Sequence, residues 1–124
     1  MTFWLLVRGS GERPLEREVD PHGIVSHSPS RRPSVQPGDL AILYAAVWQA
    51  IFGVVEVASE PLHDAARARW AWRFPLRLLA LVPDLDRAPA VEAAGIYPQS
   101  LWRHSHIRLS PEQFEAAREL VETQ

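Results

Sequence analysis

Short apolar blocks separated by turn residues run along this chain, and they predict a sheet of several strands. Residues 3–7 form an apolar block that predicts a buried first strand. Residues 40–45 and 52–58 are compact apolar runs bounded by turn signals, which predicts one antiparallel pair. Aromatic and aliphatic residues alternate with arginine over residues 70–81, the strongest strand signal in the chain. Residues 100–108 are expected to form the last strand.

Helical signals follow the predicted strands and are concentrated toward the C-terminus. Ser110 and Gln113 have the spacing of a capping box, with a proline at the first helical position, so a helix is expected from there to about Glu122. Residues 84–94 predict a short helix that ends at Gly95. Pro75 lies inside the alternating segment and requires an edge position or a bulge there.

The whole chain is expected to form one domain, residues 1–124. A long polar segment, residues 9–37, interrupts the pattern, and segments of this kind in a compact domain are usually functional or flexible. The expected fold class is α+β. We expect a mainly antiparallel β barrel or half-barrel of about five strands, with a few peripheral helices that include a C-terminal one.

Composition narrows the possible partners. The net charge of -2 argues against a broad polybasic surface that would bind duplex DNA by charge alone. The chain has no cysteine, which excludes disulfides, thiolate zinc sites and cysteine nucleophiles. The apolar N-terminal run is too short for a membrane span or a signal sequence. A soluble cytoplasmic protein without a membrane partner is therefore expected.

Catalytic and metal signatures are weak. His104 and His106 would share one face of a strand, which is compatible with two metal ligands, but no third ligand has a suitable spacing. No serine lies in a nucleophile elbow, and no glycine-rich phosphate loop precedes a helix. We therefore expect no metal, no cofactor and no catalytic residue.

Aromatic residues carry a stronger signal, because six of them come from five separate segments. Tryptophan needs a partner for its indole N–H once it is buried, and several tryptophans at element ends can form a box around a planar or cationic ligand. The alternative is that two or three of them fill the core. The set comprises Trp4, Tyr44, Trp48, Trp70, Trp72 and Trp102.

The order of motifs along the chain resembles the EVE domain of the PUA-like superfamily, which is related to YTH and ASCH domains. The matching motifs are Trp-Leu-Leu near the start, Gly-Asp-Leu-x-Ile-Leu-Tyr, Phe-Gly-Val-Val-Glu-Val and the strand Trp-x-Trp-Arg-Phe. Residues 103–114 are similar to the family's C-terminal motif Arg-x-Ser-x-x-x-Leu-(Ser/Thr)-x-Glu-Glu-Phe. The resemblance spans nearly the whole chain. The chain departs from the family in the loop after the first strand and contains no asparagine.

The resemblance implies a nucleic-acid-binding reader that holds a modified, for example methylated, or flipped nucleobase between aromatic walls. A buried methyl group is worth about 1 kcal/mol, and stacking contributes roughly 1–3 kcal/mol per base. By position, Trp4 would form the pocket floor, and Ser26 and His27 would contact the base edge. Tyr44 and Trp48 would wall the pocket. Arg103 and Ser105 would lie by the last strand, and Arg31 and Arg32 would contact phosphates.

Two other function classes remain open at this stage. An ASCH-like hydrolase or nuclease would use Glu56 with His104 or His106 as its acid and base. A protein-interaction module would use Trp48 and Trp102 as anchors. The sequence does not distinguish DNA from RNA as the partner, and it is silent on the modification and on the oligomeric state.

Overall fold

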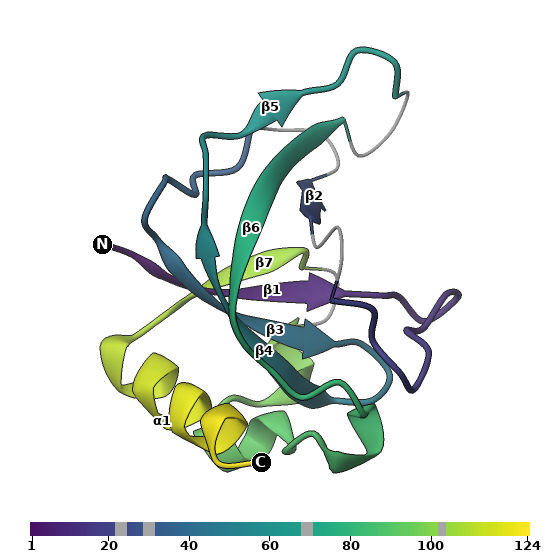
Figure 1. Cartoon of the computed structure of the whole chain (residues 1–124), viewed down its shortest axis with the longest axis vertical. Coiled ribbons are helices and arrows are strands. Elements are labelled where there is room, and N and C mark those ends of the chain that lie inside the picture. The colour runs from purple at the N-terminus through teal and green to yellow at the C-terminus, as the bar shows by residue number, and fades with distance from the viewer. Residues whose placement is uncertain (22–24, 29–31, 68–70, 102–103) are drawn as a thin grey trace.

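The computed structural model describes residues 1–21, 25–28, 32–67, 71–101 and 104–124, with the backbone alone described for 25–28 (Figure 1). The strands are β1 (Phe3–Arg8), β2 (Val25–Ser28), β3 (Leu40–Ala45), β4 (Ala50–Val57), β5 (Leu62–His63), β6 (Trp72–Leu81) and β7 (His106–Leu109). Short 3-10 helices are η1 (Leu85–Arg87), η2 (Val91–Ala94) and η3 (Pro98–Leu101), and the one α-helix among the described residues is α1 (Pro111–Glu122).

The strands form a single curled sheet in the order β2-β6-β4-β3-β1-β7, with β5 as an additional partner of β6. This confirms the α+β half-barrel with a C-terminal helix, but the main path has six strands rather than about five. The sheet is also mixed, because β1 and β3 pair in parallel while the other pairs are antiparallel. A parallel pair requires a long crossover connection, and the polar segment after β1 supplies it.

Pro75 is accommodated neither at an edge strand nor at a bulge. The ladder between β4 and β6 ends at the pair Val57–Leu76, one residue after Pro75. The ladder between β2 and β6 ends at the pair Val25–Pro75. The missing N–H of Pro75 therefore falls at the ends of both ladders rather than inside them. The bulge of β6 is at Leu79, whose side chain is 52% exposed.

The predicted helix over residues 84–94 is wrong in form. The structure has two short 3-10 helices there, and Pro89 lies between them because it has no N–H to continue a helix. Gly95 does adopt the left-handed conformation, with φ of 78°, as expected for a helix end. The predicted strand over 100–108 begins later, at His106, because Pro98–Leu101 forms η3.

The predicted C-terminal helix and its capping box are confirmed. The backbone N–H of Gln113 donates to Ser110 Oγ, and the backbone N–H of Ser110 donates to Gln113 Oε1, both at 3.1 Å. The helix buries Phe114, Ala117 and Val121 against the sheet. Phe114 stacks on Phe3 with ring centroids 4.6 Å apart, so α1 covers the sheet face that carries Phe3.

The opposite face of the sheet, called the inner face here, carries Trp4, Leu6, Leu43, Val55 and Phe74. These positions alternate with the helix-facing ones along each strand and match across the ladders. On β6 the outward positions, including Arg73 and Arg77, are exposed, whereas Phe74 is 1% exposed. The sheet therefore curls around its inner face and away from α1, as Figure 1 shows.

Residues 9–20 pack against the ends of two strands rather than projecting into solvent. The Trp48 indole N–H donates to the Leu15 carbonyl at 2.9 Å, and the Val19 N–H donates to the Pro83 carbonyl at 2.9 Å. Arg17 pairs with Asp84 at 3.0 Å. This part of the polar segment is thus tied to the end of β6. Within the described ranges, no helix combines the length and the apolar character needed to cross a membrane.

Candidate functional site

The candidate site begins at a buried carboxylate that connects two strands. The turn before β3 has Gly38 at φ of 88°, and it turns Asp39, which is 5% exposed, toward the start of β1. Asp39 accepts hydrogen bonds from the Trp4 indole N–H at 2.9 Å and from the backbone N–H groups of Thr2 and Gln36 at 3.0 Å. Burial by itself raises the pKa of Asp39, but these three donors outweigh it and hold the pKa below its ordinary value.

The ring of Trp4 is covered by two side chains of β7. The guanidinium carbon of Arg108 lies 5.5 Å from the Trp4 ring centroid, and the His106 ring meets Trp4 edge-on with centroids 5.5 Å apart. The β1–β7 ladder causes this arrangement, because it places Arg108 opposite Trp4 and His106 opposite Leu6 on the inner face. Since the indole N–H is already bonded to Asp39, Trp4 offers a neighbour only its ring.

His106 is held by the residue before it. Ser105 Oγ lies 2.9 Å from His106 Nδ1, and the Ser105 carbonyl accepts from the Val7 N–H at 2.9 Å. Burial, with a smaller contribution from the nearby charge of His104, lowers the pKa of His106 below its ordinary value. The surroundings of His106 therefore favour its neutral form.

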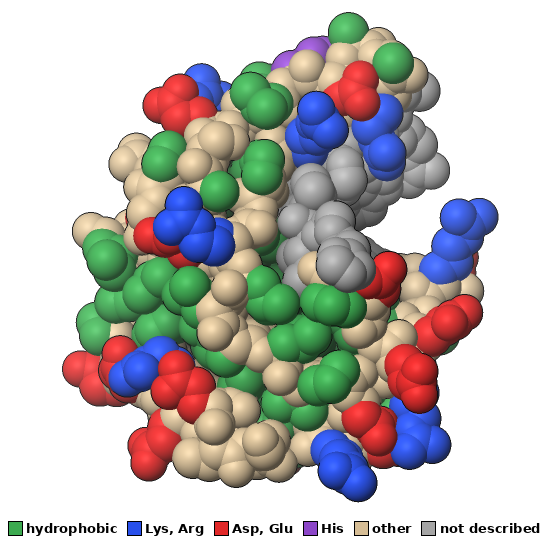
Figure 2. Space-filling model, in the orientation of Figure 1, with side chains coloured by type: hydrophobic (Ala, Val, Ile, Leu, Met, Phe, Trp, Pro, Cys, Tyr) green, Lys and Arg blue, Asp and Glu red, His purple; other side chains and the backbone are tan. Residues whose placement is uncertain are grey.

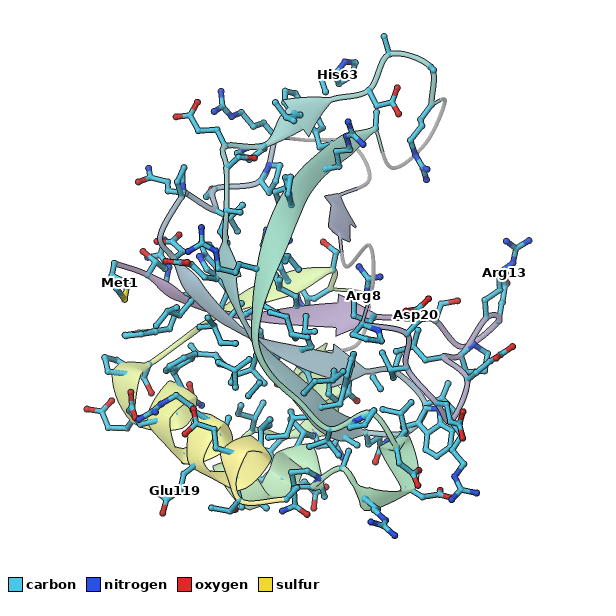
Figure 3. All side chains as sticks on the ribbon, viewed as in Figure 1. Met1, Arg8, Arg13, Asp20, His63 and Glu119 are labelled. Atoms are coloured by element: carbon cyan, nitrogen blue, oxygen red, sulfur yellow. The ribbon has the colours of Figure 1, made fainter. Side chains whose placement is uncertain are left out.

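A further cation lies on the same face at the end of β1. Arg8 follows Leu6 by two positions, so its side chain shares the inner face, and burial lowers the pKa of its guanidinium. Figure 3 labels Arg8 near the end of β1, and Figure 2 shows that basic and acidic side chains are interspersed over this view of the molecule. We call this set the inner-edge cluster. It consists of Trp4, Arg8, Ser105, His106 and Arg108.

Arg108 brings an exposed positive charge to the cluster. Among the residues that the structure describes, no carboxylate lies within salt-bridge distance of Arg108, which is exposed. The one buried carboxylate nearby, Asp39, is already occupied by three N–H donors. Chemically, the arrangement provides an aromatic and guanidinium platform beside a neutral imidazole, and this suits a flat or anionic ligand.

The structure brings together only part of the predicted site. Trp4 and Ser105 lie in the inner-edge cluster. Tyr44 pairs with Val7, so its side chain lies on the face opposite Trp4, where it is 5% exposed and burial raises its pKa. Trp48 lies in the β3–β4 connection and donates to Leu15. Trp4, Tyr44 and Trp48 therefore do not form the floor and walls of one pocket.

Several predicted contacts lie outside the described residues. For Ser26 and His27 only the backbone is described, and these residues pair with Phe74 and Arg73 of β6. Arg31 and Arg103, like Trp102, lie outside the described residues. Arg32 is exposed and lies 3.8 Å from a Glu60 carboxylate oxygen. The predicted base-edge and phosphate contacts of these residues stay predictions.

The pair of Glu56 and His106, considered for an enzyme, is not assembled. Glu56 pairs with Leu40 in the ladder and so lies on the outer face, where its carboxylate meets Arg77 at 3.0 Å. His106 lies on the inner face. The part of the chain described by the structure also holds no group of three or more histidine, aspartate or glutamate side chains placed to bind a metal ion.

Sequence reasoning missed Arg8 and Arg108 as site residues. Both alternate with apolar neighbours on their strands, which marks them only as facing away from those neighbours. The contact of Arg108 with Trp4 depends on the pairing of β1 with β7, which are about a hundred residues apart in the chain. No local signal in the sequence could have indicated that pairing.

A separate cavity of about 570 Å³ lies at the far end of β6. Its only carboxylate side chain, Asp84, already pairs with Arg17. It shares no residue with the inner-edge cluster, so the two sites are distinct. Its lining comprises Leu81, Val82, Pro83, Asp84, Arg87, Thr123 and Gln124.

Comparison with known proteins shows likeness at the level of the fold. No family model and no curated protein matches the chain. The NMR structure of a Rhodopseudomonas palustris protein matches with a TM-score of 0.62 and 14% identity, over 99% of this chain and 94% of that one. A hypothetical protein from Leishmania major matches with a TM-score of 0.60 and 13% identity, over 100% of this chain and 96% of that one. The crystal structure of an Agrobacterium tumefaciens protein matches with a TM-score of 0.57 and 15% identity, over 96% of this chain and 92% of that one. These likenesses define a shared fold, and the names of these proteins state no function.

Proposed function

We propose that this protein is an EVE-type, PUA-like reader that binds DNA or RNA and holds a modified or flipped base at the inner-edge cluster. The observation that carries the proposal is the position of Arg108 over the Trp4 ring, without a described carboxylate partner. Guanidinium planes and aromatic rings are surfaces on which unstacked bases pack. The motif order in the sequence supports the same family.

The contacts within the inner-edge cluster assign roles to Trp4 and Arg108. Trp4 is fixed by Asp39, and it holds Arg108 from one side by a cation–π contact. The side of the Arg108 guanidinium that faces away from Trp4 can then receive a base, and its charge attracts the neighbouring phosphates. A platform that is fixed before binding loses little conformational freedom on binding.

Binding to short labelled oligonucleotides tests the proposal. Single-stranded and duplex oligomers with unmodified, methylated or hydroxymethylated bases should be titrated at two salt concentrations. We expect modification to change the affinity by more than about threefold, and added salt to weaken binding because phosphates are contacted. A modification effect smaller than threefold would contradict a reader function.

Matched arginine variants locate the binding surface. Arg108→Ala should weaken oligonucleotide binding about tenfold or more, since it removes both a stacking surface and a charge. Arg87→Ala removes the same charge from an exposed position of η1 and should change binding far less. Equal effects of the two variants would indicate that net charge, rather than the inner-edge cluster, determines binding. Thermal melting of both variants checks that the fold is retained.

A further inference from the structure

The Ser105–His106 pair offers a more specific conclusion about the ligand, which rests on the proposed function. We propose that the Ser105 hydroxyl donates to His106 Nδ1, so that His106 carries its proton on Nε2 and donates it to a carbonyl oxygen of the bound base. His106 is thereby a specificity-determining residue. The ligand class it selects is a base that presents a ring carbonyl, such as thymine, uracil or guanine.

The hydrogen bond between Ser105 and His106 determines the tautomer of the imidazole. A neutral imidazole has one donor nitrogen and one acceptor nitrogen, and the partner of one nitrogen determines the role of the other. Ser105 Oγ lies 2.9 Å from Nδ1 in a half-buried position, and Nδ1 is the one side-chain or backbone acceptor within hydrogen-bond distance of this hydroxyl among the described residues. A hydroxyl that donates there leaves the hydrogen of the ring on Nε2.

Within the described part of the chain, His106 has no hydrogen-bond partner other than Ser105. The ring is held edge-on against Trp4, beside Arg108, on the inner face. An N–H that lacks a partner next to a stacking platform is suited to an acceptor on the edge of a stacked base.

The Trp4 indole N–H is already bonded to Asp39, so it cannot read the base. Arg108 carries several donors, but its position over Trp4 suits it to stacking and phosphate contacts. The Nε2–H of His106 is therefore the donor of the cluster that points in one defined direction toward a base edge. Adenine presents an amino group where guanine presents a carbonyl, so a donor at this position discriminates between them.

Nitrogen NMR of the histidine side chains tests the tautomer without any ligand. In the wild-type protein at pH 8, long-range proton–nitrogen spectra should show His106 with an unprotonated Nδ1 and a protonated Nε2. Ser105→Ala should give a mixture of both tautomers. A protonated Nδ1 in the wild-type protein would overturn the inference, whatever the oligonucleotide experiments show.

Oligonucleotide titrations test the recognition. Hexamers with a central thymine, uracil or guanine should bind about tenfold more tightly than the hexamer with a central adenine, which is the range of one hydrogen bond. His106→Phe keeps the ring and should abolish this preference, whereas His106→Gln keeps an N–H at a similar reach and should retain part of it. His63→Ala, on β5, is the control and should leave the preference unchanged.

The outcomes separate this inference from the proposed function. If all hexamers bind and Arg108→Ala weakens them, but His106→Phe leaves the base preference intact, the assignment of His106 is wrong while the reader function stands. If no oligonucleotide binds, the proposed function and the recognition step both fail. A retained melting temperature in His106→Gln shows that any loss of preference does not come from unfolding.

Discussion

The Trp4 indole nitrogen donates to Oδ2 of Asp39 at 2.9 Å, which connects the first strand of the chain to the turn that starts β3. The same carboxylate holds the backbone of Thr2 and Gln36. One buried charge thus fixes the parallel pair at the centre of the sheet. It also orients the ring on which Arg108 and His106 rest.

Replacing Asp39 with asparagine is expected to destabilise the protein by about 1–3 kcal/mol at neutral pH, because hydrogen bonds to a buried charge are lost. Equilibrium urea unfolding measures this change. Asp86→Asn, at an exposed carboxylate beside Arg17, is the control and should have little effect. A similar loss in both variants would mean that Asp39 contributes no more than a surface charge.

The low pKa of Asp39 also predicts a dependence of stability on pH. The folded-state pKa lies below the ordinary 3.8, so the unfolded chain binds the proton first as pH falls. The stabilisation is complete above pH 3.8 and is lost as pH decreases through that value toward the folded-state pKa. Unfolding measured from pH 5 to pH 2 should show this loss in the wild-type protein and a smaller slope in Asp39→Asn.

The lowered pKa of His106 predicts a second loss of stability on acidification, in a higher pH range than the loss due to Asp39. The folded-state pKa of His106 lies below the ordinary 6.5, so protonation favours the unfolded chain. Its contribution is complete above pH 6.5 and decreases as pH falls below it. Melting temperatures measured from pH 8 to pH 5 should fall less for His106→Gln than for the wild-type protein. Equal slopes would show that the environment of His106 does not disfavour its charge.

Trp48 is expected to hold residues 9–20 in place rather than to contact a base. Trp48→Phe keeps most of the ring and removes the donor to the Leu15 carbonyl, so it should cost about 1 kcal/mol and speed amide exchange in this segment. Hydrogen exchange by mass spectrometry and oligonucleotide binding are the measurements. A variant that exchanges normally but no longer binds would restore Trp48 as a wall of the pocket.

Val47 and Gln49 both have positive φ in the β3–β4 connection, and Val47 is the more strained of the two because it is β-branched. It is a β-branched residue at φ of 73°, and its side chain is 61% exposed, so little packing offsets the strain. Val47→Asn should stabilise the protein by about 1 kcal/mol, which corresponds to a rise in melting temperature of about 3–5 °C. Val47→Ile keeps the branched carbon and should give no rise. An unchanged melting temperature in Val47→Asn would show that the strain costs little.

Local sequence signals were sufficient to predict the elements that have a clear pattern within about a dozen residues. The capping box at Ser110 and the apolar stripe of α1 follow from spacing within a dozen residues, and β3 has the predicted bounds of residues 40–45. The helix expected over residues 84–94 failed, although Pro89 is visible in the sequence and disfavours a continuous helix.

The sequence by itself determined most of the strands, the C-terminal helix and the alternation of side chains along each strand. Only the tertiary structure decided which of these side chains meet. The pairing of β1 with β3 and β7 brings Trp4, Arg108 and His106 together and turns Tyr44 to the opposite face. The physical reason is that side chains alternate with a period of two, so each partner strand and its register decide the face that a residue shares, and both are set by contacts between distant segments.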